Sequence, residues 1–253
     1  VIRLEQQRAI DDYDKSIRVD PEDSETYVDR GIAYYNLSEA ARWQSADATK
    51  SGHQDAQELL RRAINDFDKA IELDPACAKA HDERGIAYWA LGEFDQATED
   101  FDKAIELDPT FAKAYDDRGT AYYEQGEPQQ AMKHYAKAVQ LDPTFAKGYV
   151  NRGWAYQGLG ESQRAKEDYD KAIELDPDYS EAYVKRGVAY HELGETQRET
   201  ADYDKAIQLE PDYSLTYMLR GNVYQALSMT SQAQEDFDKY NSLNREHIPR
   251  STR

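Results

Sequence analysis

The chain has 253 residues, of which 40% are hydrophobic and 32% charged, with 31 Lys and Arg against 50 Asp and Glu. The resulting formal charge of −19 disfavours a nucleic-acid backbone or membrane surface as partner and favours basic protein segments. Cys77 is the only cysteine, so an intramolecular disulfide and a cysteine-based zinc site are excluded. No stretch reaches the roughly 18 to 20 apolar residues of a membrane span. Nothing requires an oxidising compartment, and we expect a cytoplasmic location.

A unit of 34 residues repeats along the chain, which is typical of a helical repeat array. Each unit ends on an acidic residue followed by proline, at Pro21, Pro75, Pro109, Pro143, Pro177 and Pro211. Each also contains an Arg-Gly pair with tyrosine three residues after the glycine, and these glycines are Gly31, Gly85, Gly119, Gly153, Gly187 and Gly221. Apolar residues such as Ala97, Phe101 and Ala104 fall at helical spacing, which predicts helices with one buried stripe.

This pattern resembles the tetratricopeptide repeat over nearly the whole chain. In residues 78–111 the seven characteristic positions of that repeat hold His81, Gly85, Tyr88, Ala97, Phe101, Ala104 and Pro109. The resemblance implies an all-α fold in which antiparallel helix pairs stack into a right-handed superhelical solenoid.

In chain order, residues 1–23 are predicted to form the second helix of a truncated repeat, so we expect the parent protein to continue toward the N-terminus. Residues 24–247 are divided into six repeats and 248–253 form a tail; the repeats are 24–77, 78–111, 112–145, 146–179, 180–213 and 214–247. The first repeat has an insertion near 38–57 that is predicted to form a helical hairpin. Trp43 is expected to pack near Leu59, although the hairpin could instead be a docking surface.

Glycine and charged residues indicate how the helices end and approach one another. Leu91-Gly92, Leu159-Gly160 and Leu193-Gly194 are predicted to end first helices, and the acid-proline steps to end second helices. The glycine after each arginine predicts a close helix approach filled by aromatic rings. The arginines themselves could form an anion site, but a structural ladder with second-helix aspartates is favoured, interrupted at His134. Glu199 stands where the other repeats have alanine, and Arg186 is its expected partner.

The resemblance implies that first helices line a concave face that contacts a peptide. In the first three repeats the contact positions are mostly acidic or aromatic: Asp29, Tyr35, Asp82, Glu83, Trp89, Asp116, Asp117 and Tyr123, with Lys79 and Lys113 as exceptions. In the last three they are more apolar: Lys147, Val150, Asn151, Trp154, Val184, Lys185, Val188, Met218 and Asn222. Asp116 and Thr120 replace the lysine and asparagine of a chaperone-tail clamp, so that ligand is disfavoured.

These observations predict a protein-binding adaptor rather than an enzyme. The five histidines form no metal-binding motif, no phosphate loop or nucleophile elbow is present, and no cofactor or metal is expected. The predicted partner segment has basic residues toward one end and an apolar anchor toward the other. Two alternatives remain, a regulatory module from a larger enzyme and a scaffold that self-associates through its array ends or its hairpin.

Overall fold

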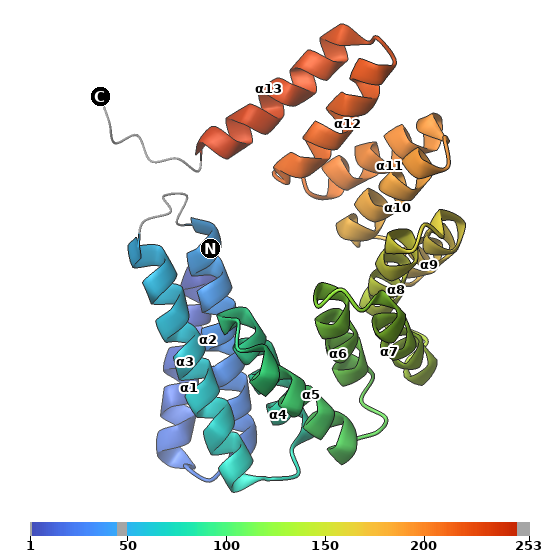
Figure 1. Ribbon diagram of the computed structural model, residues 1–253. Coiled ribbons are helices and arrows are strands. Elements are labelled where there is room, and N and C mark those ends of the chain that lie inside the picture. The colour runs from blue at the N-terminus through green and yellow to red at the C-terminus, as the bar shows by residue number, and fades with distance from the viewer. Residues whose placement is uncertain (1, 45–49, 247–253) are drawn as a thin grey trace. The chain divides into compact units, whose positions relative to one another are not determined.

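The computed structural model describes residues 2–44 and 50–246 and consists there of helices joined by short turns (Figure 1). The first helices of the pairs are α2 Ser24–Gln44, α4 Ala78–Leu91, α6 Ala112–Glu124, α8 Ala146–Gly158, α10 Ser180–Glu192 and α12 Ser214–Ala226. The second helices are α1 Ile2–Val19, α3 Lys50–Leu73, α5 Phe94–Leu107, α7 Pro128–Leu141, α9 Ser162–Leu175, α11 Thr196–Leu209 and α13 Thr230–Glu246. The prediction of an all-α repeat fold is confirmed for the described residues.

The helix ends follow the local chemistry of the sequence. At the end of α4, Gly92 has φ +81° and donates its N–H to the Trp89 carbonyl, while Glu93 donates to the Tyr88 carbonyl. A left-handed residue at this place satisfies carbonyls that the helix would otherwise leave unpaired, and only glycine adopts it without strain. The helix α5 ends one residue before Asp108, whose proline neighbour disfavours further helix. Both kinds of predicted helix end are confirmed.

The two helices of a pair approach closely at the predicted Arg-Gly position. A Cβ placed on Gly85 would lie 2.8 Å from Cε1 of Phe101, and one on Gly187 would lie 2.5 Å from Cε1 of Tyr203. Phe101 and Tyr203 are both 2% exposed, so each ring fills the space that the missing side chain leaves. The cost of a helical glycine is therefore offset by burial of an aromatic side chain.

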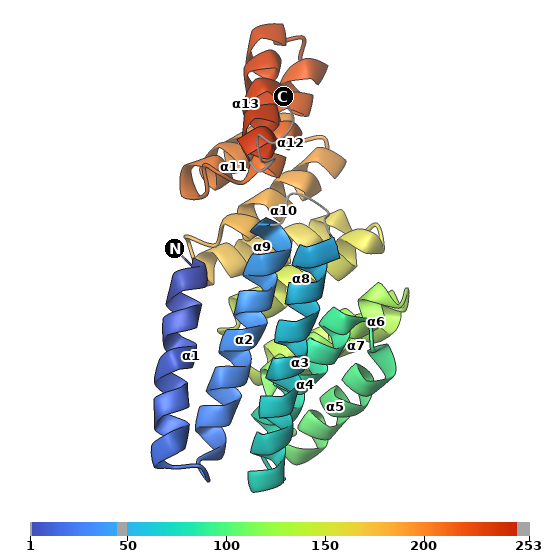
Figure 2. The same cartoon turned by 90° about the vertical axis from the view of Figure 1, so that its left-hand side faces the viewer.

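One compact unit comprises Val1–Ala121, which is α1 to α5 and most of α6. Its helices pack in chain order, α1 on α2, α2 on α3, α3 on α4 and α4 on α5, and Figure 2 shows the first three standing side by side. The helices α2 and α3 have 21 and 24 residues, whereas α4 and α5 have 14 each. The tip of the predicted hairpin, residues 45–49, and the packing of Trp43 lie outside the described part of the chain.

The other compact unit comprises Tyr122–Arg253, which begins in the last turn of α6 and includes α7 to α13. Each helix from α7 onward packs against the next one along the chain. The interior holds one fully buried tyrosine from each of three second helices, Tyr135 of α7, Tyr169 of α9 and Tyr203 of α11. Ala165 and Ala172, on the same helix as Tyr169, are buried in one cluster with that ring, and their small side chains let the neighbouring helices approach closely.

A ladder of ion pairs ties neighbouring helix pairs together, as the sequence predicts. Arg186 donates through Nε and Nη2 to both oxygens of Asp202, at 2.8 and 2.7 Å, and through Nη1 to Asp170 of the preceding pair at 2.7 Å. Equivalent bonds are formed by Arg30, Arg84 and Arg220. Arg118 pairs with Asp102, because His134 occupies the position of the usual second-helix aspartate. Bidentate pairs of this kind are the stronger class of charged hydrogen bond.

The prediction that Arg186 is the partner of Glu199 is wrong. Arg186 is engaged by Asp202 and Asp170, and the carboxylate of Glu199 instead lies 3.1 Å from Nδ1 of His191. Burial raises the pKa of Glu199, and His191 opposes that shift. The histidine stands on the exposed edge of α10 and supplies the polar contact that a buried carboxylate requires.

Candidate partner-binding site

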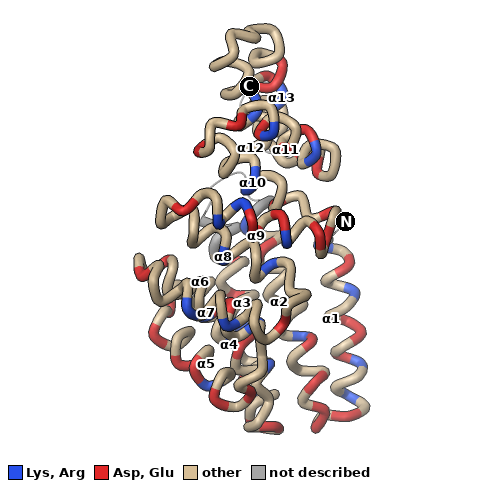
Figure 3. The backbone as a smooth tube through the Cα atoms, turned by 90° about the vertical axis from the view of Figure 1, so that its right-hand side faces the viewer, with Lys and Arg blue, Asp and Glu red and all other residues tan. Residues whose placement is uncertain are grey.

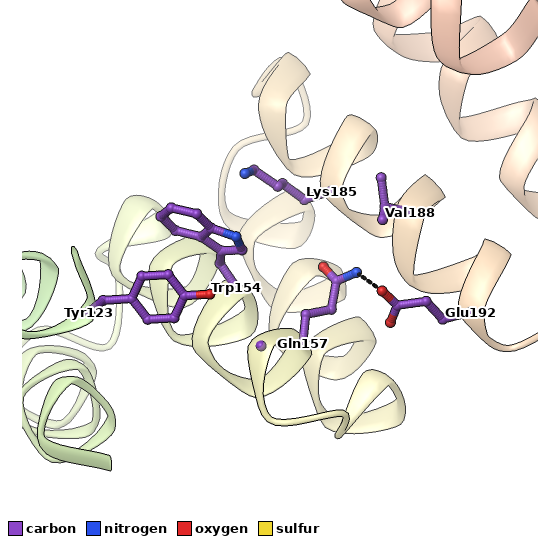
Figure 4. A pocket seen from close by; sticks show the side chains of 7 residues that line it. Tyr123, Trp154, Gln157, Lys185, Val188 and Glu192 are labelled. Atoms are coloured by element: carbon purple, nitrogen blue, oxygen red, sulfur yellow. Dashed lines mark hydrogen bonds between the residues drawn. The ribbon is translucent and has the colours of Figure 1, made fainter. Parts of the chain in front are cut away.

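The surface of the second unit is hollowed beside the first helices α8 and α10. This pocket has a volume of about 310 Å³ and is lined by Tyr123, Trp154, Gln157, Gly158, Lys185, Val188 and Glu192 (Figure 4). Four of these residues, Tyr123, Trp154, Lys185 and Val188, belong to the contact positions predicted from the sequence. The structure thus places these four residues, from three first helices, around one pocket.

Helix geometry places Trp154 in the pocket. The preceding residue, Gly153, faces Tyr169 of α9, where an added Cβ would lie 2.7 Å from Cε1 of that ring. Successive helical residues point about 100° apart, so the side chain of Trp154 leaves the helix away from that contact. The Trp154 ring is half-buried and packs on Tyr123, with ring centroids 4.5 Å apart and planes inclined by 40°.

A glycine and a lysine complete the aromatic wall. A Cβ on Gly158 would lie 2.6 Å from the hydroxyl oxygen of Tyr123, so the absence of a side chain there makes room for the tyrosine. On the other helix, the ammonium nitrogen of Lys185 lies 4.4 Å from the centroid of the Trp154 ring. That distance is within the range of a cation–π contact.

The polar residues at the other end of the pocket bond to one another. Gln157 donates its amide N–H to Oε1 of Glu192 at 2.9 Å, and Ser162 donates its hydroxyl to Oε2 of the same residue at 2.5 Å. The buried hydroxyl of Tyr169 donates to Oε1 of Gln157 at 2.7 Å, and burial raises the pKa of that tyrosine. This network fixes α8 relative to α9 and α10 and so keeps the pocket open in a defined shape.

The first unit has a different arrangement at its predicted contact positions. The ammonium group of Lys113 contacts three carboxylates, Asp82, Asp117 at 2.9 Å and Glu83 at 3.3 Å. Burial, and next the charge of Asp117, raise the pKa of Asp82 to about 8. Burial opposes ionisation of Lys113, but the surrounding carboxylates outweigh it and raise the pKa of Lys113. Oδ1 of Asp82 is buried and receives no hydrogen bond from a described residue. This Lys113 cluster is closed by the chain itself.

The remaining predicted contact residues differ in access. Four have buried side chains and present little or no surface to a partner in this structure: Asp82, Asp116, Val150 and Val184. At least partly exposed are Asp29, Tyr35, Glu83, Trp89, Asp117, Tyr123, Lys147, Asn151, Trp154, Lys185, Val188, Met218 and Asn222. Asp29 pairs with Lys79 at 3.2 Å, and Trp89 packs on Phe94 with ring centroids 4.5 Å apart.

Sequence reasoning did not include Gln157, Gly158 and Glu192 among the contact residues. Gln157 and Gly158 follow Trp154 by three and four residues, and Glu192 follows Val188 by four. Residues at these spacings share a helix face, so one further turn along each first helix would have identified them.

Within the described part of the chain, no three or more His, Cys, Asp or Glu side chains are grouped so that they could hold a metal ion. The described helices include none with the length and apolar composition of a membrane span.

Family models match the central part of the chain. Two models described as Tetratricopeptide repeat match residues 78–111 and 146–179, and 101–133 and 168–200, and one described as TPR repeat matches 119–160. Residues 78–200 are therefore built of tetratricopeptide repeats. No curated protein matches the chain in sequence.

Solved structures with a similar fold include a crystal structure of MamA, which is 28% identical with a TM-score of 0.57 over 64% of this chain and 95% of that chain. The Cut9-Hcn1 hetero-tetramer of APC/C matches 97% of this chain and 46% of that chain, with 15% identity and a TM-score of 0.76. PilF of Pseudomonas aeruginosa matches 81% of this chain and 90% of that chain, with 21% identity and a TM-score of 0.62. The last two likenesses concern the fold alone.

Proposed function

We propose that this tetratricopeptide repeat protein is an interaction scaffold that holds a segment of a partner protein against its first helices. The Trp154 pocket, defined by its seven lining residues, is the place where an apolar side chain of that segment is anchored. The observation that carries the proposal is the half-buried indole of Trp154 in a pocket lined by residues of α6, α8 and α10.

The size and lining of the pocket support an anchoring role. An engineered cavity of about 150 Å³ binds benzene, so a pocket of about 310 Å³ has room for one ring and its flanking backbone. Tyr123, Trp154 and Val188 provide an apolar wall, and aromatic residues in such pockets supply much of the energy of protein association. The pocket is held by hydrogen bonds within the chain, which lowers the entropy lost on binding.

The partner segment is further proposed to carry basic residues that meet the first unit. Acidic residues are spread along the helices of both units, as the red stretches of the backbone in Figure 3 show. In the first unit Asp29, Glu83 and Asp117 remain partly accessible, whereas Asp82 and Asp116 are buried. The accessible carboxylates would mainly raise the association rate, because rim charges steer encounter more than they add affinity.

Affinity capture with matched variants tests the proposal. The wild-type chain, Trp154→Ala and Leu227→Ala are immobilised and exposed to one cell extract, and the captured proteins are identified by mass spectrometry. Leu227 is a suitable control because it is also in the second unit and 50% exposed, but does not line the pocket. A true partner is lost from Trp154→Ala and kept by Leu227→Ala.

The partner is then titrated against the three proteins. We expect Trp154→Ala to weaken binding by roughly 2 kcal/mol or more, chiefly through faster dissociation, and binding to weaken as salt is added. A partner that binds wild type and Trp154→Ala equally would show that the pocket is not the binding site.

A further inference from the structure

The polar groups of the Trp154 pocket indicate the chemistry of its ligand. We infer that the anchored segment carries an aspartate or glutamate next to its apolar side chain, and that this carboxylate is bound by Lys185 and Trp154. The inference rests on the proposed function, since it specifies what occupies the same pocket.

Three donors of the pocket, the Lys185 ammonium, the Trp154 indole N–H and the Tyr123 hydroxyl, have no hydrogen-bond acceptor within the described chain. The carboxylate nearest to the Lys185 ammonium belongs to Glu181 at 4.0 Å, which is beyond hydrogen-bond distance. Ring contacts with Tyr123 and with Lys185 account for the interactions of Trp154, so its indole N–H donates to no described group. The hydroxyl of Tyr123 likewise donates to none.

The carboxylate oxygens of Glu192 and the amide oxygen of Gln157, in contrast, each accept one hydrogen bond from the chain. Oε1 of Glu192 accepts from Gln157, its Oε2 accepts from Ser162, and Oε1 of Gln157 accepts from Tyr169. A ligand therefore meets donors that lack a partner and acceptors that have one. Such a set favours a group made of acceptors only, and an ionised carboxylate is that group.

The arrangement of the donors fits an apolar side chain with a carboxylate beside it. Figure 4 shows the indole nitrogen of Trp154 on the side of the ring that faces Gln157 and Val188, with Lys185 above the ring. The ring itself forms the wall against which an apolar side chain packs. Two adjacent residues of the ligand, one apolar and one acidic, can therefore contact the aromatic face and the two donors at the same time.

The occupant is an internal segment of a partner protein. The first-helix surface of the second unit continues on α12, where Met218 is partly exposed and Asn222 exposed, so a bound chain can run past the pocket. The pocket supplies one ammonium group, and Glu192 stands at its far end, so one carboxylate beside Lys185 is complementary and a second would meet Glu192.

Three small probes that share one ring isolate the charge preference: 3-phenylpropionate, 3-phenylpropionamide and 3-phenylpropylamine, the last as its ammonium. Each is titrated into the full chain at 0.15 M salt, about physiological ionic strength, which limits long-range repulsion by the acidic protein. Binding is followed by the NMR signal of the Trp154 indole N–H, assigned with Trp154→Phe.

We expect the carboxylate to bind more tightly than the amide and about tenfold more tightly than the ammonium. Lys185→Met should lower the affinity for the carboxylate to that for the amide and leave the amide unchanged. Arg198→Met is the matched control, because it removes an exposed positive charge of the same unit that does not line the pocket, and it should keep the order.

The possible results separate the inference from the proposed function. If the amide or the ammonium binds as tightly as the carboxylate, or if Lys185→Met leaves the order unchanged, the carboxylate preference is overturned while the apolar anchor stands. If none of the probes shifts the Trp154 signal, the pocket takes no such ligand and both proposals fail.

Discussion

Lys113 in the first unit and Lys185 in the second are similarly exposed but have different surroundings. Their side chains are 34% and 28% exposed, and both project from first helices. Lys113 contacts three carboxylates and closes its site, whereas the carboxylate nearest to Lys185 is 4.0 Å away and the ammonium lies over an aromatic ring. If Lys185 binds a partner as proposed, the hydrogen-bonding state of a lysine distinguishes a binding residue from a structural one better than its exposure does.

The largest expected effect is a difference in local stability between variants of two adjacent residues on α10, Arg186 and Lys185. Arg186→Met should lower the local free energy of unfolding by about 3 kcal/mol, because it leaves the carboxylate of Asp202, 6% exposed, buried without its partner. Lys185→Met should change it by less than about 0.5 kcal/mol, since no strong pair is lost. Hydrogen exchange of α10 and α11 measures both, because stability in repeat arrays is local. Equal losses would mean that Lys185 is structural too.

A smaller loss is expected in the Lys113 cluster. Lys113→Met removes the cation from three carboxylates and should cost about 2 kcal/mol in the first unit. The loss is less than for Arg186 because Lys113 is 34% exposed and because Asp82 can take up a proton. Urea unfolding followed by circular dichroism checks it, with Lys103→Met, which breaks an exposed pair with Glu106, as the control. A loss no larger than the control's would show that the cluster is not closed by Lys113.

Asp82 should make the stability of the first unit depend on pH. Its pKa in the folded chain is raised to about 8 from the usual 3.8, so the folded state binds the proton more tightly than the unfolded state. This contribution is fully present below pH 3.8, decreases as pH rises, and is lost above about 8. Between pH 5 and 8, the urea midpoint of Asp82→Asn should therefore fall less than that of the wild type. Parallel curves for wild type and variant would contradict the prediction.

The smallest effect should be the same in both units. Gly92 and Gly160 have φ +81° and +77°, and a Cβ on either would meet nothing within 4 Å. Alanine at either position should then cost about 1 kcal/mol through backbone strain alone. Thermal unfolding of the two single variants measures this cost. A clearly larger loss in one unit would show that its turn has a further structural role.

The sequence alone determined the helix pairs, their ends and the ladder, because these depend on interactions that recur at a constant spacing. An arginine and the aspartate 16 residues later face each other whenever the two helices of a pair fold back, so Arg84 and Asp100 could be paired without coordinates. The glycine beside each arginine indicated the close approach for the same reason. Such features need only the geometry of one repeat and its neighbour.

The tertiary structure decided which contact positions are open. Whether the carboxylate of Asp82 faces a partner depends on where the flexible side chain of Lys113, 31 residues away, comes to rest. The same holds for Glu199, which bonds to His191 because Arg186 is already taken by two aspartates. Glu192 and Gln157 line the pocket because they hydrogen-bond to each other, while Glu192 also accepts from Ser162 and Gln157 from Tyr169. Long side chains choose among several partners within reach, and only packing in three dimensions selects one.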